Sequence, residues 1–235
     1  MNKGLVPALL ISLFLGLTGC GKNENNPEQA ASVITKTEKI PEENDKTELT
    51  TKDKADIKEA SKPETVEGLG EITPVGFGYN DDLGIDGTDS KSKPQTFDGY
   101  EVYVEGFAVS HVKPDEKAMA FFNDSNNFQA ILVQIKVKNN KDDTHSNVVY
   151  EPSEIKLEVQ GEMIYAEPVL SDAFEAIEEG QEQSGMAWFI VKNESPIKSA
   201  KLTLPSESGS SHPTEKTYKF DILDIKNSIY KDNHS

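Results

Sequence analysis

The sequence predicts a mainly β fold, an antiparallel β-sandwich of two sheets with one or two short helices. Apolar and polar residues alternate with a period of two, which is the spacing of side chains on one face of a strand. Turn-forming residues interrupt this alternation at intervals of roughly 8 to 15 residues, as they do in sandwich domains. About 165 residues carry the pattern, which is the length of one domain.

Three segments show the alternation most clearly. Residues 100–104 alternate until Gly106 interrupts them, and a glycine at such a phase slip is typical of a β-bulge. Residues 131–137 alternate in the same way. Residues 155–159 alternate and are followed by Gly161-Glu162, which fits a two-residue hairpin turn with glycine first. These segments predict half-buried antiparallel strands.

Residues 185–191 are apolar on both phases, which is typical of a central strand with both faces covered. Trp188 lies in this strand and is expected in the core. A short helix is expected to begin at Pro114, where proline precedes acidic residues. Residues 171–179 fit either a second helix with Ser171 as its N-cap or an irregular loop. Two further strands are expected at 197–204 and 218–222.

The N-terminus has the pattern of an export signal. Lys3 supplies a positive charge, and residues 5–17 form an apolar segment shorter than the roughly 20 residues of a membrane-spanning helix. Leu17-Thr18-Gly19-Cys20 resembles the lipobox of bacterial lipoproteins, in which the cysteine is acylated and follows the cleavage site. The resemblance implies a signal peptide at 1–19 and a lipid such as palmitate on Cys20. An uncleaved helical anchor and a plain secretory signal are the alternatives.

Residues 20–70 are expected to form an acidic, disordered linker. The first aromatic residue after the signal is Phe77, and the segment is rich in Lys, Glu, Thr, Asn and Pro. Such a composition buries too little apolar surface to offset the conformational entropy of folding. A helical patch at 52–61 is marginal on its own. The linker would hold a folded domain, residues 71–235, away from the membrane.

Composition excludes several classes of function. The chain carries 41 acidic residues against 24 lysines and no arginine, a formal net charge of −17. Such a chain repels nucleic acid and lacks the planar guanidinium groups that contact phosphates and bases in pairs. Cys20 is the only cysteine, so its acylation would leave no thiol for a disulfide or a thiolate nucleophile.

Two strands and the N-terminal organisation resemble a known family. The segments Ile131–Asn140 and Gly185–Val191, with the lipobox and the acidic linker, are similar to the uncharacterised immunoglobulin-like lipoproteins of low-GC Gram-positive bacteria. The resemblance implies an immunoglobulin-like sandwich and a lipid-anchored position on the extracellular face of the cell membrane. It also implies a non-catalytic module that binds a protein or envelope partner, with no catalytic residue to transfer.

Candidate residues for chemistry are few. The sequence holds no metalloprotease, nucleophile-elbow, P-loop or dinucleotide motif, and its four histidines are isolated and expected to be exposed. We therefore expect no enzyme activity and no cofactor, apart from calcium at one loop. Asp82, Asp86 and Asp89 lie in that oxygen-rich loop and are candidate calcium ligands, although Asp and Gly are also common in ordinary turns. A small-ligand or calcium-binding receptor component of the cell envelope is the alternative function.

The lipobox predicts the outcome of removing Cys20. A Cys20→Ala protein has no thiol to acylate, so it should leave the detergent phase in Triton X-114 partitioning of labelled cells, whereas the unchanged protein should remain there. A variant that partitions like the unchanged protein would rule out the lipoprotein interpretation.

Overall fold

The structure is a computed structural model. It describes residues 49–86, 92–97, 99–121, 128–140, 152–174, 177–192, 195–205 and 215–234. The strands are β1 (Glu64–Val66), β2 (Gly70–Asn80), β3 (Ile85–Asp86), β4 (Gln95–Phe97), β5 (Tyr100–Pro114), β6 (Phe128–Asn139), β7 (Lys156–Val159), β8 (Glu162–Tyr165), β9 (Glu182–Val191), β10 (Ser199–Pro205) and β11 (Glu215–Asp224). The helices are α2 (Thr51–Ala60), α3 (Glu116–Phe121) and α4 (Ile225–His234), with short 3-10 turns at Asp81–Leu83 and Pro152–Glu154.

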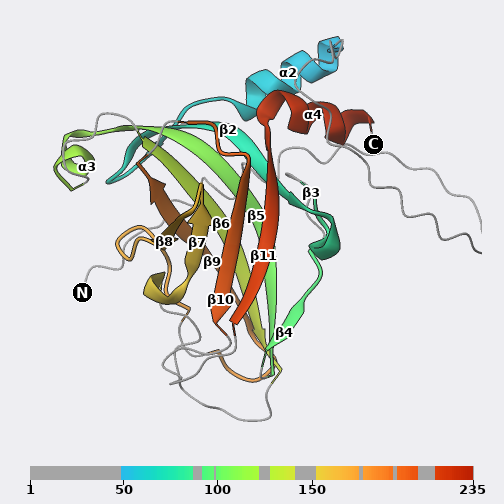
Figure 1. The fold of residues 1–235 in the computed structure, drawn as a ribbon, viewed down its shortest axis with the longest axis vertical. Coiled ribbons are helices and arrows are strands. Elements are labelled where there is room, and N and C mark those ends of the chain that lie inside the picture. The colour runs from blue at the N-terminus through green and yellow to red at the C-terminus, as the bar shows by residue number, and fades with distance from the viewer. Residues whose placement is uncertain are drawn as a thin grey trace, which may run out of the picture.

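The described strands form one continuous antiparallel sheet. Its order is β8-β7-β10-β11-β2-β5-β6-β9, with β1 and β3 paired to β2 and β4 paired to β5, and it curls around a core (Figure 1). The mainly β class is therefore confirmed. The structure differs from the predicted sandwich in that hydrogen bonding joins the strands into a single sheet instead of two facing ones.

Bulges in the central strands bend this sheet. The pairing of β5 with β6 shifts register between Val104 and Gly106, so the bulge predicted at Gly106 is confirmed. A second shift lies in β2 between Pro74 and Gly76. Bulges increase local twist and bend the strand, which allows one sheet to surround its own core.

Aromatic rings fill the concave side of the sheet. Phe107 of β5 and Phe220 of β11 stack with ring centroids 4.6 Å apart, across the strand between them. That strand, β2, carries Gly78 at this point, and a Cβ there would lie 2.7 Å from the Phe107 ring. Glycine is therefore required at residue 78 by the close approach of the ring.

The outer edge of β9 is hydrogen-bonded by an irregular segment. The backbone N–H of Glu167 donates to the carbonyl of Trp188 at 2.7 Å, and that of Asp172 donates to Met186 at 2.9 Å. In return, the Ser171 and Asp172 side chains accept from the backbone N–H groups of Trp188 and Met186, both at 2.9 Å. Of the two alternatives for residues 171–179, the described residues follow the irregular loop and not the helix, because these side chains cap a strand edge.

The predicted strands at 131–137, 185–191, 197–204 and 218–222 are present as β6, β9, β10 and β11, although β9 ends the sheet order and is not the central strand that was expected. Trp188 is 4% exposed and packs with Leu69, Val112 and Phe128 in an apolar cluster separate from the main core, so its predicted burial is confirmed. The helix expected from Pro114 begins slightly later. β5 continues to Pro114, and Asp115 caps α3 by accepting from the backbone N–H of Ala118 at 2.8 Å.

The β7–β8 hairpin turns one residue earlier than predicted. Gln160 and Gly161 have φ angles of 53° and 85°, so the two-residue turn has glycine second instead of first. The register Leu157↔Ile164 then directs Met163 and Tyr165 to the opposite face, where they are 52% and 53% exposed.

The folded part of the chain begins earlier than the predicted boundary at residue 71. α2 and β1 lie inside the segment 20–70 that was expected to be a linker, and β1 pairs with β2. Ile57 and Ala60 of α2 pack against an apolar cluster that contains Ile225 and Ile229 of α4 (Figure 1). α2 is stable because α4 supplies the apolar partner that an isolated helix lacks. The sequence pattern did not predict α4. Residues before Leu49 lie outside the described residues.

A buried carboxylate fixes α2 to α4. Asp53 is completely buried. It accepts from the backbone N–H and the hydroxyl of Thr50, the N-cap of α2, and from the Asn233 side-chain amide at 2.9 Å. The His234 ring lies 3.4 Å from the same carboxylate. Burial raises the pKa of Asp53, but the hydrogen bonds from Thr50, Asn233 and His234 outweigh it and hold the pKa well below its usual range.

The burial of Trp188 generates a stability prediction. Trp188→Ala should lower the free energy of unfolding by about 3 to 5 kcal/mol, measured by urea denaturation, because it leaves a cavity in the apolar cluster that Trp188 forms with Leu69, Val112 and Phe128. Met163→Ala, at an exposed position, is the matched control and should change stability by less than about 0.5 kcal/mol. Equal effects of the two substitutions would contradict the described packing.

The Asp53 contacts predict when α2 detaches. Limited proteolysis of the chain from residue 20 onward should leave a fragment that begins near Leu49, whereas Asp53→Ala should move its start toward Gly70. Glu59→Ala, an exposed position on the same helix, is the control and should leave the fragment unchanged.

Acid should have the same effect on the unchanged protein. The folded pKa of Asp53 lies below its ordinary value of 3.8, so the stabilisation by the ionised carboxylate is complete above that value. It is lost as the pH falls below 3.8 through the folded pKa. Detachment at neutral pH would contradict this assignment.

Candidate binding groove

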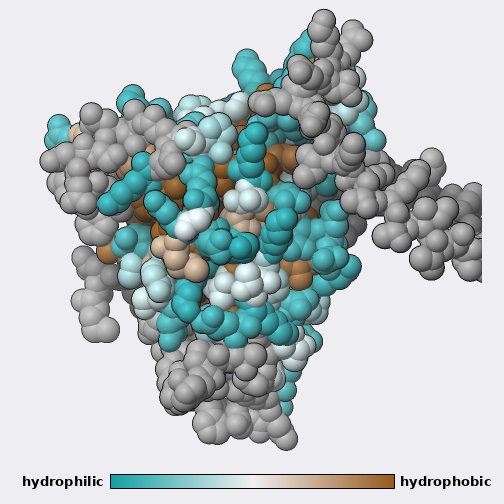
Figure 2. Space-filling view, viewed as in Figure 1, coloured by the Kyte–Doolittle hydropathy of each residue, from teal (hydrophilic) through white to brown (hydrophobic). Residues whose placement is uncertain are grey.

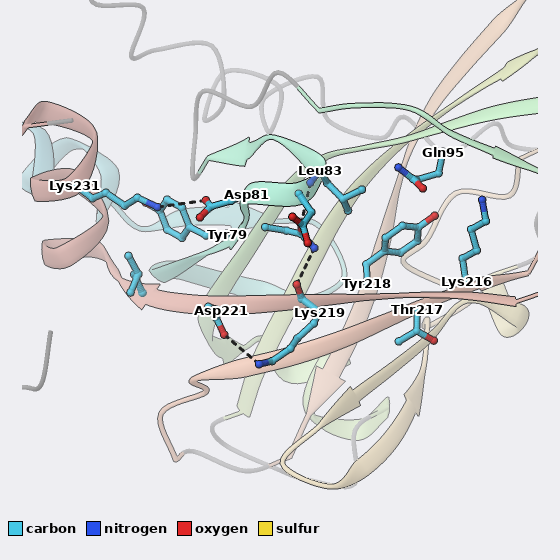
Figure 3. Close-up of a pocket in the computed structure, with 13 residues that line it drawn as sticks. Tyr79, Asp81, Leu83, Gln95, Lys216, Thr217, Tyr218, Lys219, Asp221 and Lys231 are labelled. Carbon is cyan, nitrogen blue, oxygen red and sulfur yellow. Dashed lines mark hydrogen bonds and ion pairs between the residues drawn. The ribbon is translucent and has the colours of Figure 1, made fainter. Parts of the chain in front are cut away.

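A groove of about 920 Å³ opens beside β11 in the curled sheet (Figure 3). It lies between the 3-10 turn at Asp81–Leu83, strand β4 and the first half of β11. Its lining includes Tyr79, Asp82, Leu83, Gln95, Lys216 and Tyr218. The sheet itself creates the groove, because neighbouring strands separate here.

The separation follows from where β2 ends. β11 pairs with β10 from Glu215 to Asp221, but it pairs with β2 only from Asp221 to Asp224. β2 ends at Asn80, and beyond it the described strands leave a gap between β11 and β4, which pairs with β5. No described strand therefore pairs with β11 on this side between Thr217 and Phe220.

Side chains bridge the gap at both ends. At one end, the Lys216 ammonium donates to the carbonyl of Thr96 in β4 at 2.9 Å. At the other end, the Asn80 side-chain amide donates to the carbonyl of Lys219 at 2.8 Å, while its oxygen accepts from the backbone N–H of Leu83 at 3.0 Å (Figure 3). These contacts hold the two walls of the groove in place without closing it.

A buried hydroxyl lies between the two bridges. Tyr218 is 7% exposed, and its hydroxyl is buried without a hydrogen-bond partner among the described residues. Its ring points from β11 toward the side of the groove formed by Leu83 and Gln95 (Figure 3). Burial raises the pKa of Tyr218 far above its ordinary value, so the hydroxyl keeps its proton and can both donate and accept.

Charged groups surround the groove in near balance. Lys231 lies 3.8 Å from Asp81 and 4.2 Å from the centroid of the Tyr79 ring, and Lys219 lies 4.0 Å from Asp221. The exposed residue Asp82 lines the groove beside them. On the face viewed in Figure 2 the surface is mainly hydrophilic, with small apolar areas between polar side chains.

The structure places only part of the predicted site residues. Cys20 and Asp89 lie outside the described residues, and Asp86 is placed in β3 by its backbone alone. Asp82 lines the groove. Among the described residues, no three His, Cys, Asp or Glu side chains are grouped as metal ligands, and the calcium hypothesis stays a prediction.

Both described histidines, His111 of β5 and His234 of α4, are exposed, as expected. His234 also contacts the buried carboxylate of Asp53 and stacks on Tyr230 with centroids 4.3 Å apart. The contact with Asp53 joins α4 to α2. The isolated position of His234 in the sequence gives no indication of this contact.

Comparisons with known proteins identify no family. No family model and no curated protein matches the chain. A crystal structure described as a functionally unknown protein from Listeria monocytogenes EGD-e aligns with a TM-score of 0.49 and 16% identity, over 70% of this chain and 96% of that one. In the part of the chain that is described, no helix is long and apolar enough to cross a membrane.

The groove cannot be recognised in the sequence, because each of its residues has an ordinary role when it is considered alone. Tyr218 was expected as one apolar position in a strand, and its burial follows that pattern. The signal that was available is the hydroxyl, since a buried tyrosine normally finds a hydrogen-bond partner. Which tyrosine lacks one depends on where β2 ends, and this is a tertiary property.

The unpartnered hydroxyl predicts the sign of a substitution. Tyr218→Phe should leave the free energy of unfolding unchanged or raise it by up to about 3 kcal/mol, because it removes a buried polar group that makes no hydrogen bond among the described residues. Tyr103→Phe is the control and should lower stability by about 1 kcal/mol, since the Tyr103 hydroxyl donates to Glu101 at 3.0 Å. Denaturation of both variants tests this, and a clear loss of stability in Tyr218→Phe would contradict it.

Proposed function

We propose that this protein is a lipid-anchored surface protein whose β-rich module binds a protein or envelope partner through the groove beside β11, without catalysis. The observation that carries the site is the Tyr218 hydroxyl, which is buried at the groove and unpartnered among the described residues. Leaving such a group without a partner costs about 1 to 3 kcal/mol, and a ligand that supplies the partner recovers that free energy.

The anchor rests on the sequence. Leu17-Thr18-Gly19-Cys20 follows a short apolar segment, and the attached lipid would hold the protein at the extracellular face of the membrane. Because the described fold begins at Leu49, the linker proposed between the lipid and the module is shorter than the sequence alone predicted. The immunoglobulin-like relationship stays a prediction, and the binding proposal does not depend on it.

The size of the groove supports a second candidate. About 920 Å³ lies within the range of pockets that hold small molecules. A small polar ligand would also satisfy the Tyr218 hydroxyl, which would make the protein a receptor component of the envelope. A macromolecular partner is favoured because the groove is open along a strand edge and is not an enclosed cavity.

Photocrosslinking in intact cells tests the proposal. A photoreactive amino acid at Asp82, an exposed groove residue, should give adducts with a macromolecule, whereas the same amino acid at the exposed residue Lys113 of β5 should not. Tyr218→Phe should reduce the yield from residue 82. Equal adducts from both positions, or none from residue 82, would contradict binding of a macromolecule at the groove.

A further inference from the structure

We propose that the partner is an extended peptide segment that adds a strand to the sheet in the gap between β11 and β4. This inference rests on the proposed function and names the class of partner. Three features of the groove support it: the direction of the backbone groups on β11, the Lys216 side chain that crosses the gap, and the Asn80 side chain at its end.

The backbone groups of β11 that face the gap can be identified from the alternation of an antiparallel strand. The N–H of Ile222 donates to the carbonyl of Lys198, toward β10. Successive residues point to opposite sides, so Lys219 and Thr217 direct their N–H and C=O groups into the gap. The bond from Asn80 to the carbonyl of Lys219 agrees with this assignment.

The gap continues the line of β2. At Tyr79, β2 pairs with Asp221 of β11 on one side and with Asp86 of β3 on the other. Beyond Asn80 the described β2 stops, and β4 takes its place beside β5. A strand inserted in the gap would therefore extend β2 and run antiparallel to β11.

The contact across the gap at its Lys216 end is made by a long side chain and not by a backbone hydrogen bond. Two strands that flank a missing strand lie about 10 Å apart, twice the usual spacing. A lysine side chain with its hydrogen bond has a comparable length. Closer strands would pair directly, as β11 and β2 do.

The Asn80 side chain already imitates the missing strand. Its amide group has the chemistry of a peptide bond, and it donates to the carbonyl of Lys219 as the next residue of β2 would. An inserted peptide needs only to continue this pattern at Thr217. Main-chain hydrogen bonds of this kind give affinity in strand addition, and pockets for alternate side chains give specificity.

Tyr218 supplies the specificity. Side chains on the same face of neighbouring strands contact one another, so the inward side chain of the peptide beside Tyr218 meets the unpartnered hydroxyl. Ser, Thr or Asn at that position would form the missing hydrogen bond. The net charge of −17 favours the approach of a neutral or basic peptide over an acidic one.

The experiment uses the full mature chain and a phage-displayed library of random ten-residue peptides. We expect enriched peptides with a hydrogen-bonding residue at one position. Hydrogen exchange with the enriched peptide should slow at the backbone amides of Thr217 and Lys219. A scan that methylates one peptide amide at a time should weaken binding about tenfold at alternate positions.

Variants of β11 give the matched test. Thr217→Pro removes the N–H that faces the gap, at an edge where proline is tolerated, and should weaken peptide binding about tenfold. Thr217→Val keeps that N–H and should bind as before. Tyr218→Phe should bind the peptide less tightly and lose the preference for Ser, Thr or Asn. If Thr217→Pro does not fold, the methylation scan decides.

Three results would overturn the inference: no enriched peptide, a methylation effect without alternation, or unchanged exchange at Thr217 and Lys219. Crosslinks from residue 82 to a macromolecule that is not a peptide would leave the proposed function intact and exclude strand addition. If residue 82 gives no crosslink but the enriched peptide binds and slows exchange at Thr217 and Lys219, strand addition is supported and binding of a macromolecule in intact cells is contradicted.

Discussion

The sheet depends on one constraint, that the backbone groups at its edges must find hydrogen-bond partners where neighbouring strands are missing. At β9 this is achieved by a segment that is not a strand. Ser171 and Asp172 use side-chain oxygens in place of backbone carbonyls, and the backbone of Glu167 and Asp172 supplies the reciprocal donors. Both ends of the sheet are thereby connected, since this segment follows β8 directly. The concave core with Phe107 and Phe220 is enclosed as a result.

The same constraint is met incompletely beside β11. Asn80 donates to the carbonyl of Lys219, and Lys216 reaches across to β4. Between these two contacts no described strand pairs with the backbone of β11, and the Tyr218 hydroxyl has no hydrogen-bond partner among the described residues. An unpaired strand edge is usually a liability that proteins cover or charge. Here it is recessed in a groove with charged residues around it, which limits access to a narrow, extended partner. This difference between the two edges is the physical basis of the function we propose.

Local patterns predicted the strands but not the way in which they meet. Period-two alternation identified β6, an apolar run on both phases identified β9, and the phase slip at Gly106 identified a bulge, because all three depend on neighbouring residues alone. The role of Ser171 stayed open between a helix cap and a loop, since a serine hydroxyl accepts a backbone N–H equally well at a helix start or a strand edge. The docked helix α2 was missed because its stability comes from α4, about 175 residues away, and the groove was missed because it is defined by the end of β2.

The docking of α2 on α4 has a mechanical consequence. If the lipid proposed for Cys20 holds the chain, tension on the module enters through residue 49 and acts first on α2 and β1. A helix held at one face by a few side chains, including Asp53 and Asn233, separates contact by contact, whereas the long pairing of β5 with β6 must break all its bonds together. Moderate tension would therefore release residues 49–69 while the sheet and the groove stay folded. At roughly 3.4 Å per residue the released segment has an extended length of about 70 Å, and the gain in reach is this length less the distance that the segment spans when folded. The helix pair would therefore act as a length reserve between the membrane and the binding edge.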